Sequence, residues 1–246
     1  MLQKASELAK KIHGSLSEFP TSAPLALVYT DERLELHINS AESSSSPPHI
    51  LFIDFLHGKA GYRQAHNCTI NQPLARAVGI KSGFRPTVFD ATAGMGGDAF
   101  VLASLGCTVQ MSERSVIIGS ILQDALDRAL ANPKTVQIIG NRLSLVLGDA
   151  RQTMLQLTEP PHTIYMDPMY PHRRKSALGS LEMRLLRLIA GDDEDSSALL
   201  EEALKVATNR VVVKRPKGAP LIAGKPPTHE IIMKNSRFDV YLHHYL

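Results

Sequence analysis

The stretch VFDATAGMGGDAF, residues 88–100, decides the fold. A short apolar run ends on Asp90, and Gly94, Gly96 and Gly97 then occupy three of four positions before a helix-like segment begins. Glycine lets the backbone approach a ligand closely, and the amide groups at a helix N-terminus point toward that ligand. The stretch therefore predicts the strand, turn and helix with which an open α/β sheet binds a ligand.

Length and composition are those of a globular protein. The 246 residues are 43% hydrophobic and 21% charged, which excludes a disordered chain and predicts one domain with a small appendage. The net charge of +3 permits a nucleic-acid partner without indicating one. No apolar run is long enough to span a membrane and the N-terminus lacks a secretion signal, so we expect a cytoplasmic protein without a membrane partner. Cys68 and Cys107 have no metal-ligand spacing, and we predict no metal site.

Residues 1–72 are expected to form a small N-terminal α+β extension. Residues 25–30 and 33–39 have strand-like patterns and are joined by two acidic residues, which predicts a hairpin. Residues 49–55 are a third strand candidate.

Residues 73–246 alternate strand and helix patterns. This alternation predicts an α/β domain of Rossmann-like type, with a mostly parallel seven-stranded sheet covered by helices on both faces. Strands are expected at 87–91, 107–113, 143–149, 163–167 and 210–215, with a hairpin in the tail THEIIMKNSRFDVYLHHY closing the sheet edge. Helices are expected at 98–105, 115–131, 177–190 and 195–208.

Two classes of cofactor suit the glycine turn. Gly94, Gly96 and Ala99 match G-x-G-x-x-A, and Glu113 stands at the distance expected of an acid that binds ribose, as in dinucleotide enzymes. Asp90 argues against a dinucleotide, because a carboxylate sits poorly beside a pyrophosphate. S-adenosylmethionine (SAM) has no phosphate, and its ammonium and sulfonium charges favour a nearby carboxylate. SAM is therefore the expected cofactor, and a dinucleotide-dependent oxidoreductase is the rival.

Three acids stand at the ends of successive predicted strands. Asp90, Glu113 and Asp149 would line the carboxyl edge of the sheet, where open α/β sheets bind their ligands. There they can accept hydrogen bonds from the ammonium, ribose hydroxyls and adenine amine of SAM, respectively.

The segment MDPMYPHRRKSA, residues 166–177, follows the fourth predicted strand. An exocyclic amine of a base is a poor nucleophile and needs an acceptor on its N–H bonds, for which Asp167 and the Pro168 carbonyl are the candidates. Tyr170 is the candidate platform for stacking an extruded base. Positive charges beside this pocket suit a phosphate backbone, and they come from His172, Arg173, Arg174 and Lys175.

Lys214 and Arg215 follow the fifth predicted strand, at the same sheet edge. They are candidates for contact with RNA phosphate or for orienting Asp167. A basic pair facing solvent is an equal alternative.

Several segments together resemble one bacterial family. DATAGMGGDAFVLASLGC, SER, YMDPMYPHRRKSAL, EMR and VVVKRP are similar to the RsmJ family, the guanine-N2 methyltransferases of 16S ribosomal RNA. The resemblance implies a class I methyltransferase fold. It also implies contacts to SAM at Gly97, Asp98, Glu113, Arg114, Asp149, Ala150 and Asp167.

The expected activity is methyl transfer from SAM to the N2 amine of a guanine in 16S ribosomal RNA, as the RNA alone or in the small ribosomal subunit. The expected route is in-line displacement without a metal or a covalent intermediate. Another nucleobase amine, adenine N6 or one in DNA, is an alternative target. A non-catalytic RNA-binding or assembly protein is a further alternative, and the sequence makes no prediction of oligomeric state.

Overall fold

The computed structural model describes residues 2–18, 23–39, 47–57, 69–169, 189 and 195–243. The helix expected at 177–190 lies outside these residues except at position 189.

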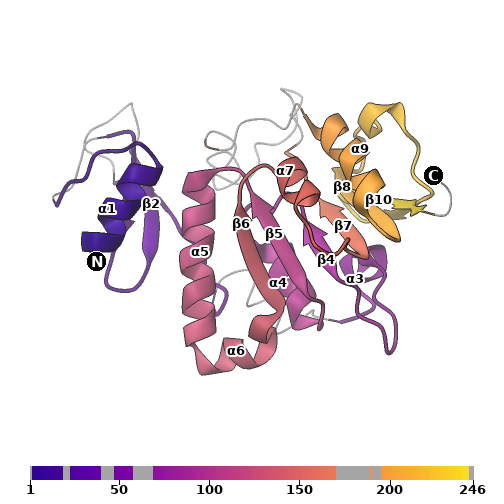
Figure 1. Cartoon of the computed structure of the whole chain (residues 1–246), viewed down its shortest axis with the longest axis horizontal. Helices are drawn as coiled ribbons and strands as arrows, with labels where there is room; N and C mark the ends of the chain where they lie inside the picture. The colour runs from indigo at the N-terminus through magenta and orange to yellow at the C-terminus, as the bar shows by residue number, and fades with distance from the viewer. Residues whose placement is uncertain are drawn as a thin grey trace.

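A seven-stranded sheet forms the centre of the molecule, in the order β6-β5-β4-β7-β8-β10-β9 (Figure 1). The first five strands in this order, from β6 to β8, pair in parallel with their neighbours. Strand β10 runs antiparallel to both β8 and β9. The chain starts the parallel sheet at β4, builds outward through β5 and β6, and then returns to place β7 on the other side of β4. The mostly parallel seven-stranded prediction is confirmed. The strands are β4 Val88–Asp90, β5 Val109–Glu113, β6 Leu143–Leu147, β7 Thr163–Met166, β8 Arg210–Pro216, β9 His229–Ile232 and β10 Ser236–Leu242.

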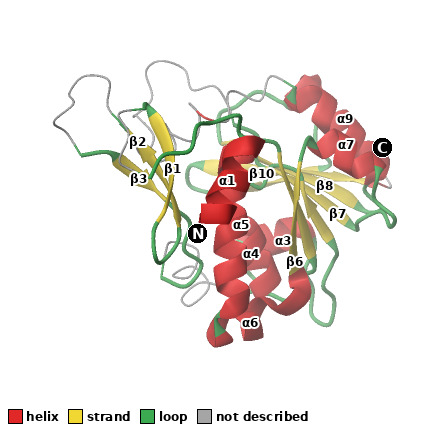
Figure 2. Cartoon of the chain, turned by 60° about the vertical axis from the view of Figure 1, so that its left-hand side comes forward, coloured by secondary structure: helices red, strands yellow, loops and turns green. Residues whose placement is uncertain are grey.

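Helices cover both faces of this sheet (Figure 2). Successive strand residues alternate between two buried apolar clusters, so that Val88 and Tyr165 belong to one and Phe89 and Ile164 to the other. The first cluster packs under α3, α4 and α5, and the second under α7 and α9. In the described part of the chain, no helix has the length and apolarity needed to cross a membrane. The helices are α3 Pro73–Val78, α4 Gly97–Ser104, α5 Val116–Ala131, α6 Pro133–Ile139, α7 Ala150–Leu155 and α9 Ser196–Val206.

The two ends of α5 follow from local chemistry. The Ser115 side chain caps the helix by accepting from the backbone N–H of Ile118. The apolar residues that recur at helical spacing along α5 are buried, including Ile121 and Leu122. Pro133 lies beyond the end of α5 and begins α6, because proline suits the first helical position and Asn132 caps the new helix.

The N-terminal extension contains α1 Leu2–Lys11 and an antiparallel sheet in the order β1-β2-β3. The predicted hairpin is confirmed by β1 Leu25–Tyr29 and β2 Leu34–Ile38. The strand predicted at 49–55 is too long, because β3 ends after His49–Leu51. The chain then turns at Asp54, whose carboxylate accepts from the backbone N–H groups of Leu56 and His57.

One apolar cluster joins the N-terminal sheet to the main domain. Leu34 and Leu36 of β2 and Phe55 are buried in the same cluster as residues of α4 and α5. Phe55 stacks on Phe100 with 4.7 Å between ring centroids, and the Arg128 guanidinium donates to the Ile53 carbonyl at 2.6 Å. In Figure 1, α5 lies between the N-terminal sheet and the main sheet. The division at residue 72 stays a prediction.

Candidate functional site

The carboxyl ends of five parallel strands meet at one edge of the sheet. Asp90 ends β4, Glu113 ends β5, and Asp149 follows β6 by two residues. Asp167 comes directly after β7, and Lys214 lies near the end of β8. The structure therefore brings together four acids and one lysine from separate parts of the sequence.

The glycine turn between β4 and α4 depends on the absence of a side chain. Gly94 and Gly96 have φ of +53° and +68°, in the left-handed region that favours glycine. A Cβ on Gly96 would lie 2.7 Å from Leu122 Cδ1 and 3.1 Å from Phe55 Cζ, both in buried side chains. Gly96 is the N-cap of α4, so the N-terminus of this helix lies at the carboxyl edge of the parallel strands.

Replacing Gly96 with alanine is expected to destabilise the protein by about 2–4 kcal/mol, because it adds both backbone strain and overpacking. The measurement is the free energy of unfolding in denaturant. Gly218→Ala is the matched control, since a Cβ there meets nothing within 4 Å and the backbone is not left-handed. A Gly96 variant as stable as the Gly218 variant would contradict the packing argument.

Glu113 ties the two turns of the site together. Its Oε2 accepts from the backbone N–H of Gly94 at 2.8 Å, and its Oε1 accepts from that of Ser115 at 2.8 Å. The residue is only 7% exposed. Ionised carboxylates have about four acceptor positions, so a carboxylate with two amide donors can still accept ribose hydroxyls.

Asp90 is the most deeply buried of the four acids, at 2% exposure. Burial raises its pKa to about 8, although a hydrogen bond from the Thr92 backbone N–H opposes the rise. The neighbouring charges of Asp98, Asp167 and Glu113 raise the pKa further. A cation bound beside Asp90 would favour its ionised form.

Asp90 predicts a pH dependence of stability. Its pKa in the folded protein lies above the ordinary 3.8, so the folded state favours protonated Asp90. The resulting contribution to the free energy of unfolding is complete below pH 3.8 and is lost as the pH rises through about 8. We expect the Tm of the ligand-free protein to fall over this range more steeply than that of Asp90→Asn, whose amide oxygen can still accept from Thr92. Thermal scans of both proteins at a series of pH values test this. Parallel curves would contradict it.

Asp149 belongs to a network of ion pairs on the opposite side of the site. It caps α7 by accepting from the backbone N–H of Arg151, and its Oδ2 pairs with Arg151 Nη2 at 2.7 Å. The hydrogen bond from the Arg151 side chain lowers the pKa of Asp149. Asp195, just before α9, bridges Arg151 at 3.3 Å and Arg114 at 3.2 Å. Ala150 is buried as the first residue of α7.

Asp167 is fixed from both its backbone and its side chain. Its backbone N–H donates to Thr92 Oγ1 at 2.6 Å, and its Oδ2 accepts from Lys214 Nζ at 2.7 Å. Lys214 also donates to Asp98 Oδ2 at 3.0 Å, and the Tyr165 hydroxyl donates to that same oxygen at 2.6 Å. Pro168 is buried beside Asp167. The proposed contacts at Tyr170, His172, Arg173, Arg174 and Lys175 lie outside the described residues.

Sequence reasoning missed Thr92 and Tyr165. Tyr165 stands two positions before Asp167, and strand alternation places two such residues on one face. Thr92 stands two positions after Asp90. These two-residue spacings from Asp167 and Asp90 are the sequence signals that could have identified Tyr165 and Thr92.

The structure places Arg215 differently from Lys214. Strand alternation turns it to the sheet face opposite that of Lys214. It is 4% exposed and donates to the Pro220 carbonyl at 2.8 Å. This burial argues against the predicted contact between Arg215 and RNA phosphate.

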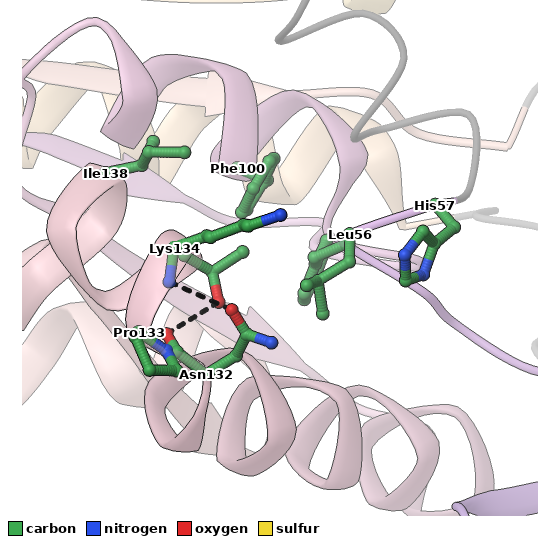
Figure 3. A pocket seen from close by; sticks show the side chains of 9 residues that line it. Leu56, His57, Phe100, Asn132, Pro133, Lys134 and Ile138 are labelled. Carbon is green, nitrogen blue, oxygen red and sulfur yellow. Dashed lines mark hydrogen bonds between the residues drawn. The ribbon is translucent and has the colours of Figure 1, made fainter.

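A hollow of about 480 Å³ lies elsewhere, beside α6 and α4 (Figure 3). None of the predicted site residues lines it. Its lining residues are Phe55, Leu56, His57, Phe100, Asn132, Pro133, Lys134, Thr135 and Ile138.

Comparisons with known proteins agree with this geometry. The model of a family described as "Putative SAM-dependent methyltransferase" matches residues 10–243. A Ribosomal RNA small subunit methyltransferase J from Desulfotalea psychrophila is 54% identical over 246 residues, which are 100% of this chain and 94% of the relative. The chain belongs to the methyltransferase J family. Another member, from Thioalkalivibrio sulfidiphilus, is 46% identical over 98% of this chain and 93% of its own.

A solved structure supports the same assignment. The crystal structure of a SAM-dependent methyltransferase from Neisseria gonorrhoeae has a TM-score of 0.75 and 31% identity, covering 99% of this chain and 93% of that one. As a member of this family, the chain is a SAM-dependent enzyme with the class I methyltransferase fold. The predicted family, fold and cofactor are confirmed.

Proposed function

We propose that this methyltransferase transfers the methyl group of SAM to the exocyclic N2 amine of a guanine in 16S ribosomal RNA. The observation that supports this proposal most directly is the position of Asp167, which lies at the same edge of the sheet as Asp90 and Glu113. The names of the relatives, ribosomal RNA small subunit methyltransferases, support the RNA substrate.

The residues at the strand edge fit SAM. Gly94 and Gly96 leave two positions of the turn without side chains, and the buried Asp90 suits a positively charged amino-acid end. Glu113 would accept from the ribose and Asp149 from the adenine amine. The further contacts are assigned to Gly94, Gly96, Gly97, Asp98, Arg114, Ala150 and Asp167. When bound, SAM supplies an electrophilic methyl group on a sulfonium centre.

Asp167 would act on the substrate amine. Its carboxylate and the Pro168 carbonyl would accept the N–H bonds of the exocyclic nitrogen and direct its lone pair toward the methyl carbon. Because the Asp167 backbone is bonded to Thr92 beside the glycine turn, the acceptor is held in fixed relation to the cofactor side.

RNA would be held by the segment after β7. Tyr170 would stack the target base, and His172, Arg173, Arg174 and Lys175 would contact phosphates. The proposed partner is 16S ribosomal RNA or the small ribosomal subunit, and the proposed location is accordingly the cytoplasm.

Mass spectrometry of 16S ribosomal RNA tests the function. RNA from cells that lack the protein should miss one methyl on a guanine, and purified protein with labelled SAM should restore it. Restoration on adenine, or on DNA only, would replace the substrate assignment. Retention of NAD in place of SAM by the purified protein would support the oxidoreductase alternative.

A further inference from the structure

The ammonium of Lys214 lies between two carboxylates that belong to different halves of the site. Lys214 Nζ is 2.7 Å from Asp167 Oδ2, at the proposed substrate side, and 3.0 Å from Asp98 Oδ2, in the first turn of α4 after the glycines. One charge therefore bridges the glycine turn and the Asp167–Pro168 corner.

Backbone register creates this arrangement. Met166 of β7 pairs with Val213 of β8, so the next position on each strand sets Asp167 beside Lys214. On the other side of β8, the register partner of Lys214 is the buried Phe238 of β10. Lys214 thus stands on a strand that has a paired neighbour on each side, and its side chain is 31% exposed.

The electrostatics also favour a fixed ammonium. Burial alone would lower the pKa of Lys214, but the carboxylates of Asp167 and Asp98 raise it well above the ordinary value for lysine. The Tyr165 hydroxyl, which donates to the same Asp98 oxygen, holds that carboxylate from a second direction. Without the cation these two like charges would repel each other, which would raise the cost of keeping both carboxylates ionised.

We propose that Lys214 is a positioning residue, which orients Asp167 toward the substrate amine and couples it to the glycine turn through Asp98. This inference rests on the proposed function of Asp167. Of the two roles that the sequence leaves open for Lys214, it favours orienting Asp167 over contact with RNA phosphate, because the ammonium is already paired with two carboxylates.

Lys214→Met tests the role by removing the charge and keeping most of the stem. We expect kcat to fall about 30-fold, less than for loss of a group that touches the reacting atoms, because Lys214 acts through Asp167. The KM for RNA and the Kd for SAM should change by less than about threefold. Lys214→Arg, which keeps the charge, should recover most of kcat.

Lys217→Met is the matched control. Lys217 is exposed just after β8 at the same sheet edge, so its loss removes an equal charge without disturbing Asp167. For each protein, kcat and KM are measured over a range of salt and pH. The acidic limb of the kcat profile should move to higher pH in Lys214→Met alone, because a carboxylate without its cation is harder to keep ionised. An unchanged kcat with a raised KM for RNA and a weaker salt dependence would identify a phosphate contact and overturn the proposal.

A measurement without RNA separates this inference from the proposed function. Carboxyl carbon NMR titration of the full chain, with Asp167→Asn used for assignment, should show Asp167 protonating at higher pH in Lys214→Met than in the wild type. If the two titrations coincide, the positioning role is wrong whatever the substrate. If 16S ribosomal RNA is not methylated but the titrations differ, the proposed function fails and the pairing role stands. Lys214→Gln replaces the methionine variant should that protein not fold.

Discussion

Asp167→Ala is expected to lower kcat for methyl transfer by about 1,000-fold or more, with RNA binding largely intact. The variant removes the proposed acceptor for the amine N–H bonds, and groups that act on the proton of a reacting nucleophile contribute at about this scale. The measurements are single-turnover transfer of labelled methyl and RNA affinity at one salt concentration.

Asp127→Ala is the control for the Asp167 variant. Asp127 is an exposed acid on α5 and takes part in a surface hydrogen bond with Gln123. Its replacement should leave both transfer and RNA binding unchanged. Equal losses of transfer and RNA affinity in Asp167→Ala would contradict a catalytic role, because they would indicate that Asp167 only helps to bind RNA.

Glu113→Ala should weaken SAM binding by about 100-fold or more. The change removes the proposed ribose acceptor and leaves the backbone N–H groups of Gly94 and Ser115 without this carboxylate. A fully buried donor left unsatisfied costs about 1–3 kcal/mol, and these part-buried donors cost less because water can reach them. The two turns that frame the cofactor would also lose the carboxylate that joins them. Calorimetric titration with SAM measures the effect.

Two comparisons make the Glu113 result specific. Glu113→Gln retains a carbonyl acceptor and should lie between the wild type and the alanine variant. Glu159→Ala, in the exposed loop before β7, should bind SAM as the wild type does. An alanine variant of Glu113 with a Kd within threefold of the wild type would remove Glu113 from the cofactor site.

Local patterns in the sequence predict much of this fold. The apolar run that ends at Asp90, the glycines after it and the helix pattern at 115–131 are short-range signals, and the structure places the strand, the turn and the helix as expected. The end of β3 was not predictable in this way. Residues 52–55 are as apolar as a strand, and only the turn at Asp54 and the stacking of Phe55 on Phe100 draw them away from the sheet.

The site was predictable to the level of strand ends, but not to the level of individual partners. Parallel strands necessarily bring Asp90, Glu113 and Asp167 to one edge. Which of two adjacent basic residues points into the site depends on register with β7 and β10, which a single sequence does not contain. For that reason the sequence predicts the same candidate roles for Lys214 and Arg215, although the two side chains face opposite sides of the sheet.

The apolar cluster shared by β2, Phe55 and α5 bears on how separable the N-terminal extension is. Deleting the extension would expose the apolar side chains of α5 that pack against it. An exposed apolar surface of this kind promotes aggregation. The extension is therefore packed against the catalytic domain through a shared core. We expect the extension and the catalytic domain to unfold in a single thermal transition. We also expect that neither part can be transferred alone into another enzyme.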